Sequence, residues 1–147
     1  MNILATILVV IAGMGLSVEA GLLGPLGMQV GHLWATLSIF GVGTALLWLI
    51  SLFVPSAKFI SWREVPKWQL SGGLLGPVYV VVLTLATPIL GVAMTMIGIL
   101  VGQTAKSFLI DSLGWFGVRK QPINLLRICG ATFLCLALYF TYLGAKL

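Results

Sequence analysis

Five long apolar runs make up most of this sequence, and each is long enough to cross a lipid bilayer as a helix. A spanning helix needs roughly 20 mostly apolar residues. Only 7% of the residues are charged and 60% are hydrophobic, so the chain cannot cover a water-soluble domain with polar groups. The sequence therefore predicts an all-α integral membrane protein, a single transmembrane domain over residues 1–147 with spans at about residues 3–23, 29–53, 70–86, 89–110 and 125–143.

Turn-forming residues separate several of these runs. Gly24-Pro25-Leu26-Gly27 follows the first run, and Thr87-Pro88 alone separates the third run from the fourth. Glycine and proline are the strongest local signals for a turn. We therefore expect the first span to end just before Gly24, and the third and fourth spans to form a tight hairpin at Thr87-Pro88.

The basic residues gather on one side of the predicted bilayer. Five spans place the N-terminus and both longer loops on that side, with these residues in or beside the loops: Lys58, Arg63, Lys67, Lys106, Arg119, Lys120 and Arg127. The other side holds only Lys146. Because basic loops stay in the cytoplasm, we predict a multi-pass protein of the inner (plasma) membrane, with its N-terminus in the cytoplasm and its C-terminus outside.

Few polar groups lie within the spans. Glu19 is the only acidic residue among them, and intramembrane carboxylates usually face a cavity and bind protons or cations. Glu19 is therefore a candidate substrate-binding residue, unless it reaches the outer headgroups. Gln103, inside the fourth span, bonds either a neighbouring helix or a substrate. Asp111 and Arg127 flank the second polar loop, and we expect them to pair across it.

Pro77 falls near the middle of the third predicted span, directly after Gly72, Gly73 and Gly76. A proline inside a helix removes a backbone hydrogen bond and clashes with the preceding turn. Membrane transporters place broken helices at substrate sites near the bilayer midplane. Pro77 is thus either a helix break beside a substrate site or a simple packing kink.

Small residues form a stripe on two of the spans. In lipid, small residues let helix backbones approach each other closely. Gly72 and Gly76 share a face of the third span with Tyr79, and Gly98 and Gly102 share a face of the fourth. We predict that these faces pack helices together, either within one chain or between two chains.

No enzyme signature appears in the sequence. It has no His-Glu-x-x-His, no Gly-x-Ser-x-Gly, no phosphate-binding loop and no acidic pair for a metal ion. A membrane enzyme needs several convergent titratable groups. The basic residues also lie in short loops rather than on a polar face. We therefore expect no catalytic activity, no metal or other cofactor, and no nucleic-acid partner.

The fourth span and the segment after it carry the most specific pattern. The signature of the YdcZ-type family, in the drug/metabolite transporter superfamily, resembles residues 102–117, which read GQTAKSFLIDSLGWFG. Pro66-x-Trp68, followed by residues 72–76 (GGLLG) and Tyr79, is similar to that family's third-helix motif. The chain departs from the family at Glu19, where a glutamine is usual, and at Lys106, where a lysine is unusual.

The resemblance implies a five-helix half-unit of a ten-helix inverted-repeat transporter, so two chains are expected to assemble in the bilayer. The loop charges predict one fixed orientation, and the partner is then a related chain of opposite charge bias or a parallel copy. The resemblance implies secondary transport of a small metabolite, and we expect Glu19, Tyr79, Gln103 and Pro77 to line its path. Glu19 favours a cationic or amphiphilic substrate and proton coupling. A small ion channel and a non-transporting accessory or scaffold subunit are the alternatives.

Overall fold

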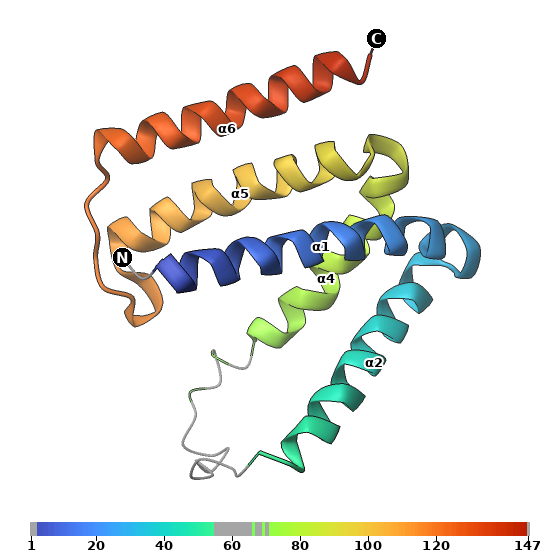
Figure 1. Cartoon of the computed structure of the whole chain (residues 1–147). Coiled ribbons are helices and arrows are strands. Elements are labelled where there is room, and N and C mark those ends of the chain that lie inside the picture. Colours follow the sequence, from blue (N-terminus) through green and yellow to red (C-terminus); the bar gives the residue numbers. More distant parts are fainter. Residues whose placement is uncertain (1–2, 55–65, 67–68, 70, 147) are drawn as a thin grey trace. The chain divides into compact units, whose positions relative to one another are not determined.

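Five long helices make up the computed structural model, which describes residues 3–54, 66, 69 and 71–146. A short 3-10 helix, η1 (Trp115–Gly117), follows the fourth of them. All five are long and apolar enough to cross a membrane, and the described residues contain no strand. The predicted all-α membrane fold is confirmed. In chain order (Figure 1) the helices are α1 (Ile3–Val30), α2 (His32–Ser51), α4 (Gly72–Leu90), α5 (Val92–Leu113) and α6 (Leu125–Gly144).

The two turns expected at Gly24-Pro25 and Thr87-Pro88 lie further along the chain. Both prolines are inside helices, α1 and α4, which continue to Val30 and Leu90. A membrane helix tolerates a proline because neighbouring groups satisfy the freed backbone. The chain turns instead at Gly31 and Gly91, whose φ angles are 91° and 79°. L-residues with a side chain avoid this backbone region, so glycine rather than proline marks each turn.

The remaining helix ends differ from the predicted spans by a few residues. The predicted second and fourth spans begin at residues 29 and 89, whereas α2 and α5 begin at His32 and Val92 because the preceding helices extend to the glycine turns. At their other ends, α2 stops at Ser51 and α5 continues to Leu113. The helix α6 matches its predicted span to within one residue.

The described chain divides into two compact units, residues 1–89 and residues 90–147. The first unit contains α1, α2 and α4, and the second contains α5, η1 and α6. The sequence predicts that all five helices form one transmembrane domain in the bilayer. This stays a prediction. Each unit is described below by itself.

Helix α1 packs against α4 in the first unit through small residues. A Cβ atom built on Gly24 would lie 3.1 Å from Cγ2 of Thr87, and one built on Gly27 would lie 3.3 Å from Cβ of Thr84. Both threonine hydroxyls donate hydrogen bonds within α4, at 2.8 Å, to the carbonyls of residues 81 and 83. Their polar groups are thus satisfied by their own helix. The Thr87 methyl lies against Gly24, whereas a Cβ on Gly27 would meet Cβ of Thr84 and, at 2.7 Å, Nδ1 of His32.

The last halves of α1 and α4 have the same burial pattern. Every buried position of α1 has a buried counterpart sixty residues later in α4: Ala20 and Val80, Leu23 and Leu83, Gly24 and Thr84, Gly27 and Thr87. Each helix then ends at a glycine with positive φ, Gly31 or Gly91, and the following helix begins directly after it. The contacts repeat too, since residue 24 meets residue 87 and residue 27 meets residue 84. We regard the two segments, residues 17–33 and 77–93, as an internal structural repeat and call them the first and second repeat segments.

An ordered loop joins α5 to α6 in the second unit. The carboxylate of Asp111 accepts a hydrogen bond of 3.1 Å from the guanidinium of Arg127, which confirms the predicted pair across the loop. The Arg127 guanidinium also donates to the Gln121 side chain. The side chain of Asn124 accepts from the backbone N–H of Arg127 at 2.9 Å and thereby caps α6. One arginine therefore ties the loop to both helices of this unit.

Candidate functional site

Glu19 and Tyr79 occupy equivalent positions of the two repeat segments. Each precedes a buried residue, Ala20 on α1 or Val80 on α4, and each is itself half-buried. The Glu19 carboxylate is close enough to the Tyr79 side chain to act on its hydroxyl electrostatically. The first unit therefore brings together two of the three residues that the sequence predicts to bind substrate.

The length of α1 places Glu19 away from both helix ends. At 1.5 Å per residue, Glu19 lies about 24 Å beyond Ile3 and about 16 Å before Val30. A span that ended near Leu23 would have left the carboxylate at the membrane surface. The extension of α1 to Val30 instead favours an interior position, where a carboxylate needs a proton, a cation or a polar partner.

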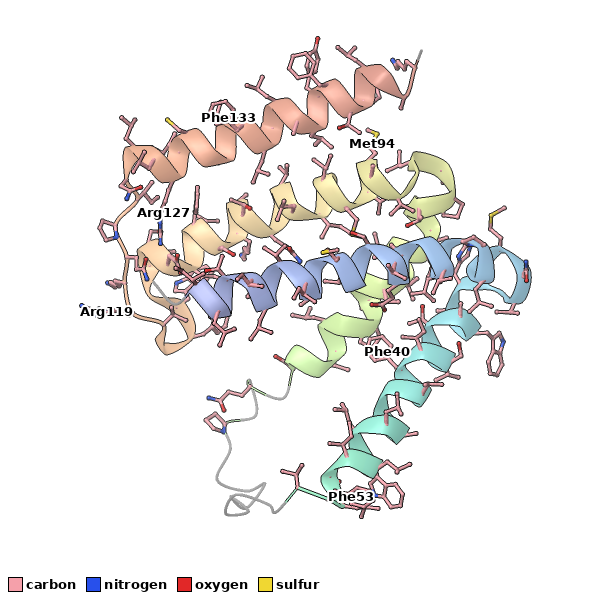
Figure 2. The ribbon with its side chains drawn as sticks, viewed as in Figure 1. Phe40, Phe53, Met94, Arg119, Arg127 and Phe133 are labelled. Atoms are coloured by element: carbon pink, nitrogen blue, oxygen red, sulfur yellow. The ribbon has the colours of Figure 1, made fainter. Side chains whose placement is uncertain are left out.

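Phe40 of α2 contacts α4 one turn away from Tyr79. A Cβ atom on Gly76 would lie 3.3 Å from Cζ of the Phe40 ring, so the ring rests directly on the glycine. Gly76 and Tyr79 are three residues apart and share a face of α4. Figure 2 shows Phe40 on α2. The Phe40 ring thus contacts α4 at Gly76, one turn from Tyr79, and the sequence reasoning had not selected it as a site residue.

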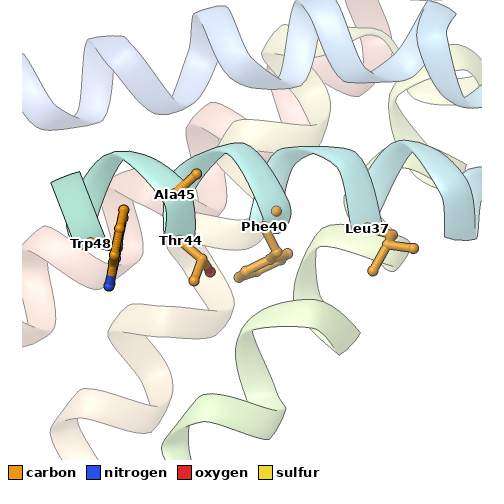
Figure 3. Close-up of a pocket in the computed structure, with 6 residues that line it drawn as sticks. Leu37, Phe40, Thr44, Ala45 and Trp48 are labelled. Atoms are coloured by element: carbon orange, nitrogen blue, oxygen red, sulfur yellow. The ribbon is translucent and has the colours of Figure 1, made fainter.

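An apolar groove of about 510 Å³ runs along one face of α2 (Figure 3). Phe40 and Trp48 supply its aromatic side chains, and Gly41 and Ala45 leave space between them. The groove is shallow and open, and residues of α2 alone line it. Phe40, the ring that rests on Gly76, is one of the residues that line this groove. Its lining residues are Leu37, Phe40, Gly41, Thr44, Ala45 and Trp48.

Gln103 belongs to the other unit. It is exposed on α5, whereas the Glu19–Tyr79 pair belongs to the unit of α1, α2 and α4. Its role in substrate binding stays a prediction.

Pro77 does not interrupt its helix. The helix α4 continues through it from Gly72 to Leu90. Proline has no N–H, so the only backbone hydrogen bond lost is the one to the carbonyl of Gly73. This position lies in the first turns of the helix, close to the N–H groups that have no partner within the helix in any case. The helix break expected at this position is therefore absent from α4. The preceding residue, Gly76, has no Cβ to clash with the proline ring.

The four glycines predicted to pack helices have different surroundings. Gly76 meets Phe40, and Gly98 lies at ordinary contact distance from Leu138 of α6, 4.0 Å for a Cβ built on it. Among the described residues, nothing lies within 4 Å of the Cβ positions of Gly72 and Gly102. The tightest glycine contacts between α1 and α4 are those of Gly24 and Gly27, which the sequence reasoning had assigned to a turn.

Comparison with known families identifies a match over most of the chain. The family model described as "Putative inner membrane exporter, YdcZ" matches residues 4–140. This range begins one residue after the first described residue of α1 and ends within α6, so it includes both repeat segments and the α5–α6 loop. Searches for similar curated proteins and for similar solved structures found no match.

Proposed function

The chain belongs to the YdcZ family of inner membrane exporters, and on this premise we propose that it exports a small amphiphilic cation in exchange for protons. The family and the five apolar helices make it a multi-pass transport protein of the inner membrane. The family points away from an enzyme. The substrate class, the coupling ion and the residues described next are our proposal.

The Glu19–Tyr79 pair is the observation that carries this proposal. A carboxylate inside a span is stabilised by a proton or by a bound cation, and one negative charge does not bind both at once. Competition between the two ligands couples uptake of one to release of the other. The Tyr79 hydroxyl lies within electrostatic reach of the carboxylate, and its proposed role is to donate a hydrogen bond to a bound substrate.

The groove on α2 supports an amphiphilic rather than a simple inorganic cation. Its walls at Phe40 and Trp48 are aromatic, and aromatic faces attract organic cations. Phe40 rests on Gly76, one turn from Tyr79. We place the apolar body of the substrate in this groove and its cationic group toward Glu19. A metal ion or a proton has no apolar part that would contact such a surface.

The active form is proposed to be a pair of five-helix chains with the N-terminus of this chain in the cytoplasm. Large apolar side chains are exposed along every one of the described helices, for example Leu8, Leu47, Leu74, Leu109 and Phe133. In the proposed pair, lipid covers some of these side chains and the second chain covers others. The basic residues Lys58, Arg63 and Lys67, which support the orientation, lie outside the described residues.

Transport by reconstituted vesicles tests this function. We expect an imposed pH gradient to drive saturable movement of an aromatic cation such as ethidium in the wild type. Glu19→Gln should reduce the rate at least tenfold because the neutral amide does not exchange a proton. Glu64→Gln, the same substitution in the segment between α2 and α4, is the matched control and should retain the rate. Non-saturating ion currents that survive Glu19→Gln would instead indicate a channel, and absence of any flux would favour an accessory subunit.

A further inference from the structure

The loop between α5 and α6 presents two basic side chains that the fold does not neutralise. Among the described residues, the only ion pair is that of Arg127 with Asp111. Lys106 lies over the Trp115 ring, with Nζ 5.2 Å from the ring centre. Arg119 and Lys120 have no acidic partner within the part of the chain that the structure describes. Figure 2 shows Arg119 extending from the loop.

The loop holds these two residues on a fixed backbone. The N–H of Gln121 donates to the carbonyl of Asp111 at 3.0 Å, which folds the loop back onto the end of α5. The Lys120 side chain packs over Gly114, where a Cβ atom would lie 2.6 Å from Cγ of the lysine. Gly114 has a φ of 67°, and its N–H donates to Ile110 at 2.8 Å. The basic pair is therefore positioned by folded structure rather than by a free tail.

Apolar side chains flank the basic pair. Phe116 has a positive φ of 59°, which a residue with a side chain rarely adopts, and 62% of its surface is exposed. Trp115, Val118 and Ile123 are also exposed. The loop connects two membrane-spanning helices, so it lies at a membrane surface. Aromatic and basic residues together are the composition that suits the lipid headgroup region.

We propose that this loop is a binding site for an anionic phospholipid. Arg119 and Lys120 bind the headgroup phosphate, and Phe116 with Trp115 contacts the upper part of the acyl chains. Each basic residue near an anionic leaflet contributes roughly 1 kcal/mol, about fivefold in affinity. The clamp made by Asp111, Gln121 and Arg127 positions the site and does not touch the lipid. This site is independent of the substrate path and of the proposed transport reaction.

Lipid retention by the purified full-length protein tests the proposal. Detergent-solubilised wild type is mixed with phosphatidylglycerol or with phosphatidylcholine of the same acyl chains, and bound lipid is counted by native mass spectrometry. We expect the wild type to prefer phosphatidylglycerol, with Arg119→Gln and Lys120→Gln each lowering its retention about fivefold. Arg119→Lys keeps the charge and should retain most of the preference. Lys146→Gln, which removes one charge just beyond the C-terminal end of α6, is the matched control and should not change it.

Three results would overturn this assignment. Equal retention of the two lipids by the wild type would show that no anionic site exists. An equal loss with Lys146→Gln would show that net charge, not the loop, sets the preference. Displacement of phosphatidylglycerol by millimolar inorganic phosphate would show a general anion site instead of a lipid site. If a glutamine variant is lost during purification, Arg119→Ser and Lys120→Ser also remove the charge and take its place in the same measurement.

Discussion

The two repeat segments have the same shape but different chemistry. Residues 17–33 and 77–93 share the same order of buried and exposed positions, and each contains a glycine turn of positive φ. Yet only three positions carry the same residue in both: Val18 and Val78, Leu23 and Leu83, Gly31 and Gly91. The common architecture therefore depends on the sizes of the buried residues and on the turn glycines rather than on close sequence similarity.

The differences are complementary at the contact. The first segment contributes the space, at Gly24 and Gly27, and the second contributes the threonine side chains that approach it, Thr87 at Gly24 and Thr84 at Gly27. The first segment carries the side chains that are most able to bind protons or cations. It carries Glu19 where the second has Tyr79, and His32 where the second has Val92. Since the second segment adopts the same shape without a carboxylate, packing does not require Glu19, and its presence calls for a functional explanation.

Filling the space in the first segment should have the largest effect. Gly27→Leu places a side chain where a Cβ alone would lie 2.7 Å from Nδ1 of His32 and 3.3 Å from Cβ of Thr84. Overpacking of this kind costs about 3 kcal/mol, and we expect thermal unfolding in detergent to show a matching loss. Gly13→Leu on the same helix is the control, because nothing lies within 4 Å of its Cβ position. Equal stability of the two variants would contradict the described α1–α4 contact.

Substituting the turn glycines tests whether the two segments are equivalent. Gly31 has a φ of 91° and a ψ of 140°, and Gly91 has a φ of 79° and a ψ of 161°. An alanine in this region costs about 1–3 kcal/mol. We therefore expect Gly31→Ala and Gly91→Ala to lower the free energy of unfolding by similar amounts, whereas Gly15→Ala, within α1, should have the opposite sign by about 1 kcal/mol. A marked difference between the two turn variants would show that the two segments are not energetically equivalent.

The sequence predicted the membrane class and the approximate spans, because the apolar runs are long and nearly free of charge. It misplaced the turns, since Gly24-Pro25 and Thr87-Pro88 are turn signals in water-soluble proteins but lie inside α1 and α4. A turn in this chain needs a positive φ, which Gly31 and Gly91 provide, and no neighbouring residue type distinguishes them from other intramembrane glycines. Because glycine occurs both at turns and at helix contacts, the sequence did not identify Gly24 and Gly27 as packing residues.

The candidate site was predictable in part. Glu19 is conspicuous as the only acidic residue within a predicted span, and Tyr79 lies on the same face as Gly76, so both were identified. The α2 groove was not, because α2 is apolar all round and its sequence does not mark which face is turned away from its neighbours. Phe40 becomes significant only through its contact with Gly76.

Proton release on substrate binding tests the central claim, that Glu19 binds either a proton or the cation, most directly. Purified protein in weakly buffered detergent is titrated with ethidium at a pH where the free protein holds the proton, and the released protons are counted with a pH indicator. The wild type should release about one proton per cation bound, as competition for one carboxylate requires, and Glu19→Gln should release none. Cation binding without proton release in the wild type, or the same release from Glu19→Gln, would contradict this assignment.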